Sequence, residues 1–165
     1  MKNFDWTKFT RKIVIQSSLQ KLYEAWATPS GIEKWFLKSA NYFDSANNKV
    51  TNRNSSVENN FTYEWNWFLY DLTEKGKIIR ANGKDFFQFS FAGECTVEVI
   101  LTEKGEFVLV ELTQKNIPTD DESKQHIRLG CDTGWAFYLV NLKSVLEGGL
   151  DLRNKNPEFK AMINS

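Results

Sequence analysis

The sequence has few of the residues on which the commonest catalytic and metal sites depend. It has a single histidine, His126, and two cysteines, Cys95 and Cys131, whose separation fits neither a metal-binding nor a redox motif. We interpret both cysteines as free thiols of a cytoplasmic protein. Phosphate-binding loops, dinucleotide fingerprints and nucleophile elbows are also missing. The sequence therefore predicts no metal and no other cofactor, and it offers no catalytic residue set.

The chain also lacks an excess of either charge. Its 21 Lys and Arg residues balance 21 Asp and Glu residues, so the formal net charge is zero. A surface that binds the phosphates of nucleic acid needs a basic excess, so we expect no nucleic-acid partner. No run approaches the ~20 apolar residues of a membrane span, and the N-terminal segment lacks the apolar stretch of a signal peptide. We therefore expect a cytoplasmic protein that does not insert into membranes.

Aromatic residues, by contrast, are abundant. They make up 15% of the 165 residues, with 6 Trp and 13 Phe. One buried tryptophan removes about 150–250 Å² from water, which stabilises the fold by at most roughly 4–6 kcal/mol. A chain of this length buries about two-thirds of its unfolded surface. We therefore expect one domain over residues 1–165, with much of its stability in a few rings.

The first part of the chain predicts one strand and two short helices. Period-2 alternation over residues 9–16 indicates a strand. A capping box at Ser17 opens a helix that ends before Pro29, because proline disfavours helical geometry in the preceding residue. A second capping box at Ser30 predicts a short helix over residues 31–36.

The middle of the chain predicts an antiparallel meander. A short strand over residues 38–43 is followed by an Asn- and Ser-rich loop over residues 44–60. Alternating apolar residues and turn signals, with a hairpin turn at Asn82-Gly83 among them, predict the remaining strands. These cover residues 61–69, 76–82, 86–91, 94–102 and 106–116.

A long helix over residues 123–148, with N-cap candidates at 119–122, is the segment around which the chain is organised. One apolar stripe consists of Cys131, Trp135, Leu139, Leu142 and Leu146, and a second set consists of Ala136, Phe137 and Val140. So wide an apolar arc predicts a helix covered on more than one side. One helix can cover so many strands only if the sheet curls around it. We therefore predict an α+β fold with a curved antiparallel sheet wrapped around the C-terminal helix.

Several pieces of the chain resemble a known family. FTRKIVIQSSLQKLYEAWATPSGIEKWF, FTYEWNW, FFQFSF, VELTQKNIP and GWAFYLVNLKSVLEGGLDLR are similar to the helix-grip fold of START domains and birch-pollen-allergen-like proteins, the SRPBCC superfamily. The resemblance is closer to the family of the activator of the heat-shock protein 90 ATPase, and it spans about residues 9–153. This chain departs from the family's pattern at Asn59-Asn60, where Gly-Gly is usual.

The resemblance implies a cavity between the sheet and the last helix, closed at one end by the two short helices. Members of the superfamily bind lipids, sterols, polyketides or other apolar molecules there, and some are cyclases or dehydratases. The eponymous domain helps to activate ATP hydrolysis by the chaperone.

The aromatic residues of the strands and the last helix are the candidate cavity residues. Alternation and helical spacing place a set of them inward: Trp35, Tyr63, Trp65, Trp67, Phe87, Phe89, Phe91, Trp135 and Leu139. They either fill the core or line a cavity, where the Tyr63 hydroxyl and the indole N–H groups would orient a ligand. The sequence is compatible with both interpretations.

Two polar residues are weaker candidates. Glu111 shares a face with Phe107 and Leu109, so it could place a carboxylate in the pocket. The rival face, which contains Val108, would leave Glu111 exposed. His126 could act as a general base, but its polar surroundings in KQHIR favour a solvated side chain.

The sequence thus leaves three functions open. The first is non-catalytic binding of a small hydrophobic or aromatic ligand between the sheet and the C-terminal helix. The second is a co-chaperone-like regulator that binds a chaperone through an exposed apolar patch near Phe137 or Phe159. The third is a cyclase or hydrolase that uses Glu111 or Tyr63. A monomer and a homodimer are both compatible with the sequence.

Overall fold

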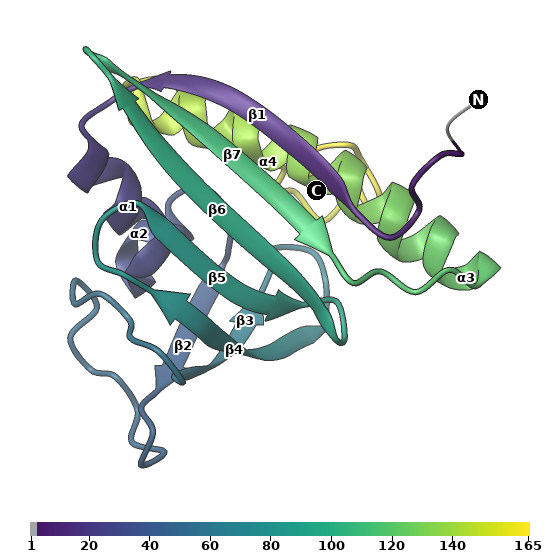
Figure 1. Ribbon diagram of the computed structural model, residues 1–165, viewed down its shortest axis with the longest axis horizontal. Helices are drawn as coiled ribbons and strands as arrows, with labels where there is room; N and C mark the ends of the chain where they lie inside the picture. The colour runs from purple at the N-terminus through teal and green to yellow at the C-terminus, as the bar shows by residue number, and fades with distance from the viewer. Residues whose placement is uncertain (1–2) are drawn as a thin grey trace.

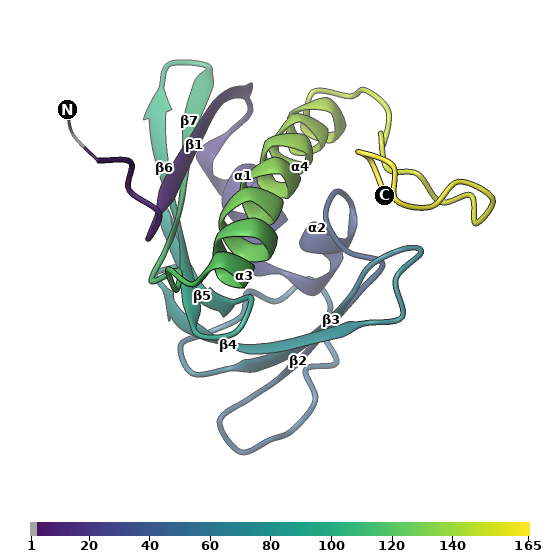
Figure 2. The ribbon, with the colours of Figure 1, turned by 90° about the vertical axis from the view of Figure 1, so that its right-hand side faces the viewer.

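A seven-stranded antiparallel sheet curves around a long C-terminal helix, which confirms the predicted helix-grip architecture (Figures 1 and 2). The computed structural model describes residues 3–165. The strands are β1 (Phe9–Gln16), β2 (Ser39–Phe43), β3 (Thr62–Asn66), β4 (Thr73–Ala81), β5 (Phe86–Phe91), β6 (Cys95–Lys104) and β7 (Phe107–Lys115), in the spatial order β1-β7-β6-β5-β4-β3-β2. The helices are α1 (Leu19–Ala27), α2 (Pro29–Glu33), α3 (Asp121–Ser123), the π-helical η1 (Lys124–Leu129) and α4 (Gly130–Leu146).

The two short helices form where the sequence predicts them, but each begins at a different residue. Ser18 rather than Ser17 caps α1, and its hydroxyl accepts a hydrogen bond from the backbone N–H three residues later. Thr28 rather than Ser30 caps α2 in the same way, at 3.0 Å. Pro29 forces Thr28 into an extended conformation and then occupies the first helical position, where its missing N–H costs nothing. One proline therefore ends α1 and starts α2.

The strand predicted over residues 61–69 is shorter than expected. β3 ends at Asn66, and β4 begins at Thr73 rather than at residue 76. Between them Leu69 has a left-handed backbone with a φ of 66°, which extended pairing does not tolerate. The chain therefore leaves the sheet and forms a loop over residues 67–72.

The last helix begins irregularly. Asp120 is its N-cap, as expected, and accepts a hydrogen bond from the Ser123 N–H at 2.9 Å. The π-helical η1 then precedes α4, a feature that the sequence did not predict. α4 buries the predicted Trp135-to-Leu146 stripe, but within this chain Ala136 and Val140 are exposed. Phe137 of the second apolar set is partly buried against the core. Cover over Ala136 and Val140 stays a prediction, because a single chain does not test it.

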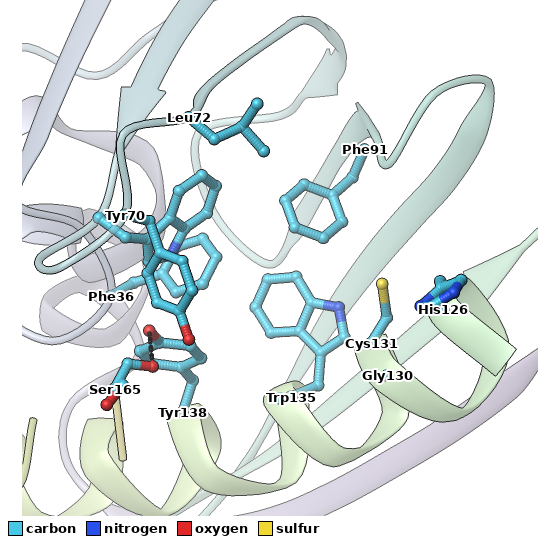
Figure 3. A pocket seen from close by; sticks show the side chains of 12 residues that line it. Phe36, Tyr70, Leu72, Phe91, His126, Gly130, Cys131, Trp135, Tyr138 and Ser165 are labelled. Carbon is cyan, nitrogen blue, oxygen red and sulfur yellow. Dashed lines mark hydrogen bonds between the residues drawn. The ribbon is translucent and has the colours of Figure 1, made fainter. Parts of the chain in front are cut away.

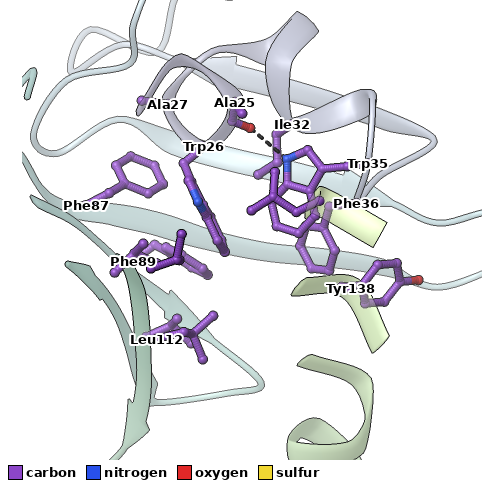
Figure 4. Packing of buried hydrophobic residues seen from close by; sticks show 14 of the residues in the cluster. Ala25, Trp26, Ala27, Ile32, Trp35, Phe36, Phe87, Phe89, Leu112 and Tyr138 are labelled. Carbon is purple, nitrogen blue, oxygen red and sulfur yellow. Dashed lines mark hydrogen bonds between the residues drawn. The ribbon is translucent and has the colours of Figure 1, made fainter. Parts of the chain in front are cut away.

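Aromatic rings fill most of the space between α1, α2, α4 and the sheet (Figure 4). Phe36 lies at the centre of this packing. Its ring stacks on Trp35 at 5.3 Å and on Trp135 at 4.8 Å between centroids. The largest fully buried side chains are Trp26, Trp35, Trp65, Trp135, Tyr42, Tyr63, Phe87 and Phe89. The rings predicted to face inward therefore do so, and most of them fill the core.

Gly76 of β4 is required by this packing. A Cβ atom at Gly76 would lie 2.4 Å from the Tyr63 hydroxyl oxygen and 2.7 Å from the Ser90 hydroxyl oxygen. The Tyr63 hydroxyl is itself held by donating to the Ser90 carbonyl. The ring of Tyr63 thus crosses the neighbouring strand where that strand has no side chain.

We expect Gly76→Ala to lower the free energy of unfolding by about 1–3 kcal/mol, the usual cost of overpacking a dense core. Urea denaturation followed by tryptophan fluorescence measures the change. Lys77→Ala is the matched control, because its side chain is exposed on the same strand and its effect should stay within ~0.5 kcal/mol. An unchanged Gly76→Ala midpoint would show that Tyr63 can move aside.

Candidate functional site

A pocket of about 380 Å³ opens between the start of the last helix and the loop over residues 67–72 (Figure 3). One wall is the helix. It contributes residues with four-residue spacing, which places them on one helix face, together with two neighbours on the adjacent row. These lining residues are His126, Gly130, Gly134 and Tyr138, with Cys131 and Trp135 beside them.

The opposite wall comes from three other parts of the fold. Phe36 follows α2, Phe91 ends β5, and the 67–72 loop supplies Trp67, Tyr70 and Leu72. The side chain of Leu72 is 65% exposed, so the loop residues form the outer rim. Ser165 lies at the same rim beside Tyr138. The pocket therefore has a buried aromatic floor and an open mouth.

The ring of Trp135 is held in place from both sides. Its indole N–H donates to the Gln114 side-chain oxygen at 3.0 Å, and both residues are buried. Phe36 stacks on its face. The Gln114 amide nitrogen has no hydrogen-bond partner within residues 3–165. Because two groups fix the indole, this wall of the pocket is rigid before any ligand arrives.

Both cysteines are free, as predicted, and Cys131 lines the pocket. Burial raises the pKa of the Cys131 thiol to about 11, and burial also raises the pKa of Cys95. A thiol with so high a pKa is protonated at neutral pH. Since the thiolate is the reactive form, Cys131 is poorly suited to be a nucleophile.

The predicted site residues fall into three groups. Trp67, Phe91 and Trp135 line the pocket, and their contact with a ligand stays a prediction. A second group lies in the core and does not line it: Trp35, Tyr63, Trp65, Phe87, Phe89 and Leu139.

Glu111 forms the third group, because it lies on the outer face of the sheet. Its carboxylate is 2.6 Å from the Lys12 ammonium group of the neighbouring strand. Val108 and Val110 of the same strand face inward and are fully buried. The placement of Glu111 in a pocket was therefore wrong, since burying the valine face is more favourable than burying a carboxylate.

Several lining residues were not predicted. Phe36 follows Trp35 directly, and its apolar character beside a helix end was the available signal. Tyr70 and Leu72 were hidden because the loop that carries them continues the alternation of β3. Gly130 and Gly134 gave no signal, because glycine has no side chain that could mark a pocket wall. His126 is exposed, as the sequence suggested, yet it borders the pocket.

The segment that follows α4 contacts both walls of the pocket. Asn141 of α4 is buried, donates to the Trp35 carbonyl at 2.7 Å and accepts from the Leu152 N–H at 2.7 Å. Arg153 donates to the Leu37 carbonyl at 2.9 Å, and its guanidinium carbon lies 5.2 Å from the ring centroid of Phe68 in the 67–72 loop. The segment from residue 151 to 153 therefore links α4, the end of α2 and the loop.

Two kinds of feature are absent within residues 3–165. No three or more His, Cys, Asp or Glu residues are grouped so that they could hold a metal ion. Over the same residues, no helix combines the length and the apolar character that crossing a membrane requires.

The sequence of residues 16–147 matches the model of the family described as activator of Hsp90 ATPase homolog 1-like protein. The chain belongs to this family. The match extends from the end of β1 to the end of α4 and so includes all the secondary structure that builds the pocket. No curated protein matches the chain.

Solved structures of similar proteins share the fold. A Staphylococcus saprophyticus protein is 22% identical with a TM-score of 0.69, over 88% of this chain and 96% of that one. The Aha1 dimer from Colwellia psychrerythraea is 21% identical with a TM-score of 0.64, and the match covers 86% of this chain and 97% of that one. CalU16 from Micromonospora echinospora is 17% identical with a TM-score of 0.62, and the match covers 92% of this chain and 78% of that one. At these identities the likeness shows the helix-grip fold.

Asp151 gives the tail contacts a pH dependence. Burial alone would raise the pKa of the Asp151 carboxyl group. Hydrogen bonds from Arg153 and Lys155 outweigh burial, so the pKa lies well below its usual value. A carboxyl group with a lowered pKa stabilises the folded state above its unfolded pKa, and this stability is lost as the pH falls through the folded pKa.

We therefore expect the wild type to be more stable than Asp151→Asn at pH 7. The difference should shrink as the pH falls below about 4, the ordinary pKa of aspartate. Denaturation curves at pH 7, 5 and 3 measure it. Asp121→Asn is the control, because its side chain is fully exposed. A difference that stays constant with pH would contradict the role given to the carboxylate.

Proposed function

We propose that this protein binds a small, largely apolar aromatic molecule in the pocket between α4 and the 67–72 loop. The observation that carries the proposal is a space of about 380 Å³ bounded by aromatic rings. These rings belong to Phe36, Trp67, Tyr70, Phe91, Trp135 and Tyr138. Sites for small molecules occupy ~300–1,000 Å³ and are lined mainly by apolar and aromatic side chains. The size and the walls of the pocket both fit that description.

The polar groups around the pocket are few and favour an uncharged ligand. Among residues 3–165 they are the His126 imidazole, the Cys131 thiol, the Trp67 indole N–H and the hydroxyl groups of Tyr70, Tyr138 and Ser165. No carboxylate, lysine or arginine side chain is among the lining groups. A ligand with a formal charge would lose its hydration without gaining an ion pair, which is costly. A neutral molecule with one or two hydrogen-bonding groups suits this site better.

The residues that line the pocket favour the hypothesis of ligand binding without catalysis. The catalytic alternative needs polar groups that converge inside the cavity. Its two candidates are separated, because Glu111 lies on the outer face of the sheet and Tyr63 donates to a backbone carbonyl within the core. The protonated Cys131 thiol adds no nucleophile. We therefore propose a carrier or sensor of a small molecule, and not a cyclase or hydrolase.

We expect neutral aromatic compounds to raise the melting temperature of the wild type, because a ligand that binds only the folded state stabilises it. Leu72→Asp should weaken that binding at least ~10-fold, since it places a charge at the rim of an apolar pocket. Leu72 is largely exposed, so the variant should still fold. Melting shifts and quenching of tryptophan fluorescence measure affinity.

Phe107→Asp is the matched control for this experiment. Phe107 is also an exposed apolar residue, but it lies at the start of β7 and away from the pocket. The control should bind like the wild type. The proposal fails if no compound of a broad neutral aromatic library shifts the melting temperature of the wild type.

A protein partner is the second candidate function. The family takes its description from an activator of the Hsp90 ATPase, and the similar Colwellia psychrerythraea protein is a dimer. The tail of this chain exposes apolar side chains, with Phe159 56% exposed and Ile163 79% exposed. Phe137, the other residue proposed for such a patch, is partly buried against the core. Phe159 and Ile163 therefore support a chaperone-binding surface better than Phe137 does.

If this second function is correct, the wild type will raise the ATPase rate of an Hsp90-type chaperone. The double variant Phe159→Ser, Ile163→Ser will lose most of that stimulation, because it removes exposed apolar anchors. Leu72→Asp will retain the stimulation, since it alters only the pocket. A steady-state ATPase assay decides, and an unchanged rate with the wild type argues against this function.

A further inference from the structure

Packing within the protein does not explain why residues 130 and 134 of the last helix are glycine. At Gly31, where packing does require glycine, an added Cβ would lie 2.1 Å from the backbone oxygen of Glu24. At Gly134 an added Cβ would meet no heavy atom within 4 Å. At Gly130 it would meet only the backbone oxygen of Gln125, at an ordinary contact distance of 3.8 Å. The protein itself would therefore accommodate a methyl group at either position.

Backbone conformation does not require these glycines either. The glycines with a positive φ are at other positions, and both of these residues are helical. Glycine within a helix is less favourable than alanine, because it loses more backbone freedom on folding. Gly130 and Gly134 thus weaken α4 without relieving a clash or a strained dihedral. Neither packing nor conformation explains their presence.

Their position suggests the reason. Both line the pocket one helical turn apart, on the face that also carries His126 and Tyr138. The rings of Trp135 and Tyr138 rise from the helix on the side of the pocket, as Figure 3 shows. Where the glycines lie, backbone atoms form the wall. Because glycine has no side chain, a ligand can approach the helix axis more closely at these two positions than it could if any other residue stood there.

On the basis of the proposed function, we propose that Gly130 and Gly134 determine the specificity of the pocket for planar, fused-ring aromatic ligands. The two residues leave a flat strip of helix backbone. A rigid ring lies against this strip with its edge between the rings of Trp135 and Tyr138. A methyl group on the strip would lift the whole of a rigid ring, whereas a flexible alkyl chain would bend around it.

Alanine substitution tests this inference with two neutral probes that have equal numbers of carbon atoms. The probes are 2-naphthol, which is planar and rigid, and 1-decanol, which is flexible. We expect Gly134→Ala and Gly130→Ala to raise the melting temperature of the free protein. Affinity for 2-naphthol should fall by about tenfold, the effect of one added carbon in an apolar pocket. Affinity for 1-decanol should change far less.

Thr133→Ala is the matched control, because Thr133 is exposed on the same helix and does not line the pocket. It should leave both affinities unchanged. If the wild type binds 2-naphthol and the glycine variants bind it equally well, the glycines do not set specificity, although the proposed function stands. If the wild type binds neither probe but another compound of the neutral aromatic library raises its melting temperature, the inference fails and the proposed function stands. If no compound of that library does so, both proposals fail. A lower melting temperature in the glycine variants would assign the glycines to packing and overturn the inference.

Discussion

The stacking of Phe36 between Trp35 and Trp135 is the contact on which the positions of the short helices and of α4 depend. The outer two rings are each held by a hydrogen bond, from Trp35 to the Ala25 carbonyl at 2.9 Å and from Trp135 to the Gln114 side chain. The three rings therefore cannot slide relative to one another without breaking a buried hydrogen bond, which would leave a polar group unpaired at about 1–3 kcal/mol. Because Trp35 belongs to the segment after α2 and Trp135 to α4, this stack sets the spacing between the two helical layers.

The same stack lies between the packed core beside α1 and α2 and the pocket beside the 67–72 loop. On the side of α1 and α2, rings such as Trp26 and Phe87 are buried in the core. On the side of the 67–72 loop, Trp135 and Phe36 present ring surface to the pocket. The sequence is compatible with either a filled or a hollow interior, and both occur in one fold. At the start of the last helix, Gly130 and Gly134 have no side chains, and there is open space over both residues beside Trp135.

Periodicity predicted most of the fold, and its failures have physical causes. The strand residues Tyr63 and Trp65 alternate with polar neighbours, and Trp67 and Leu69 continue the pattern, so the sequence favoured one long strand. Alternation cannot reveal that Leu69 adopts a left-handed backbone, so the loop that forms the pocket rim stayed hidden. On β7 the polar residue of the buried face is Gln114, whereas Glu111 had been the candidate. Both faces of that strand carry apolar residues, and the structure buries the face with Val108 and Val110, where Gln114 accepts from Trp135.

Some of the departures from ordinary local energetics lie near the pocket, and others lie elsewhere in the fold. Gly130 and Gly134 each cost about 1 kcal/mol relative to alanine. The left-handed backbone of Leu69 costs about 1–3 kcal/mol, and the unpaired Gln114 amide behind Trp135 costs a similar amount. Together these costs are a sizeable part of the ~5–15 kcal/mol by which a typical domain is stable. The buried rings offset them, because each removes a large apolar area from water. Gly130 and Gly134 lie in the helix wall, and Leu69 lies in the loop that forms the opposite rim, so these costs fall on both sides of the opening. A site that stays open for a ligand would require such a distribution.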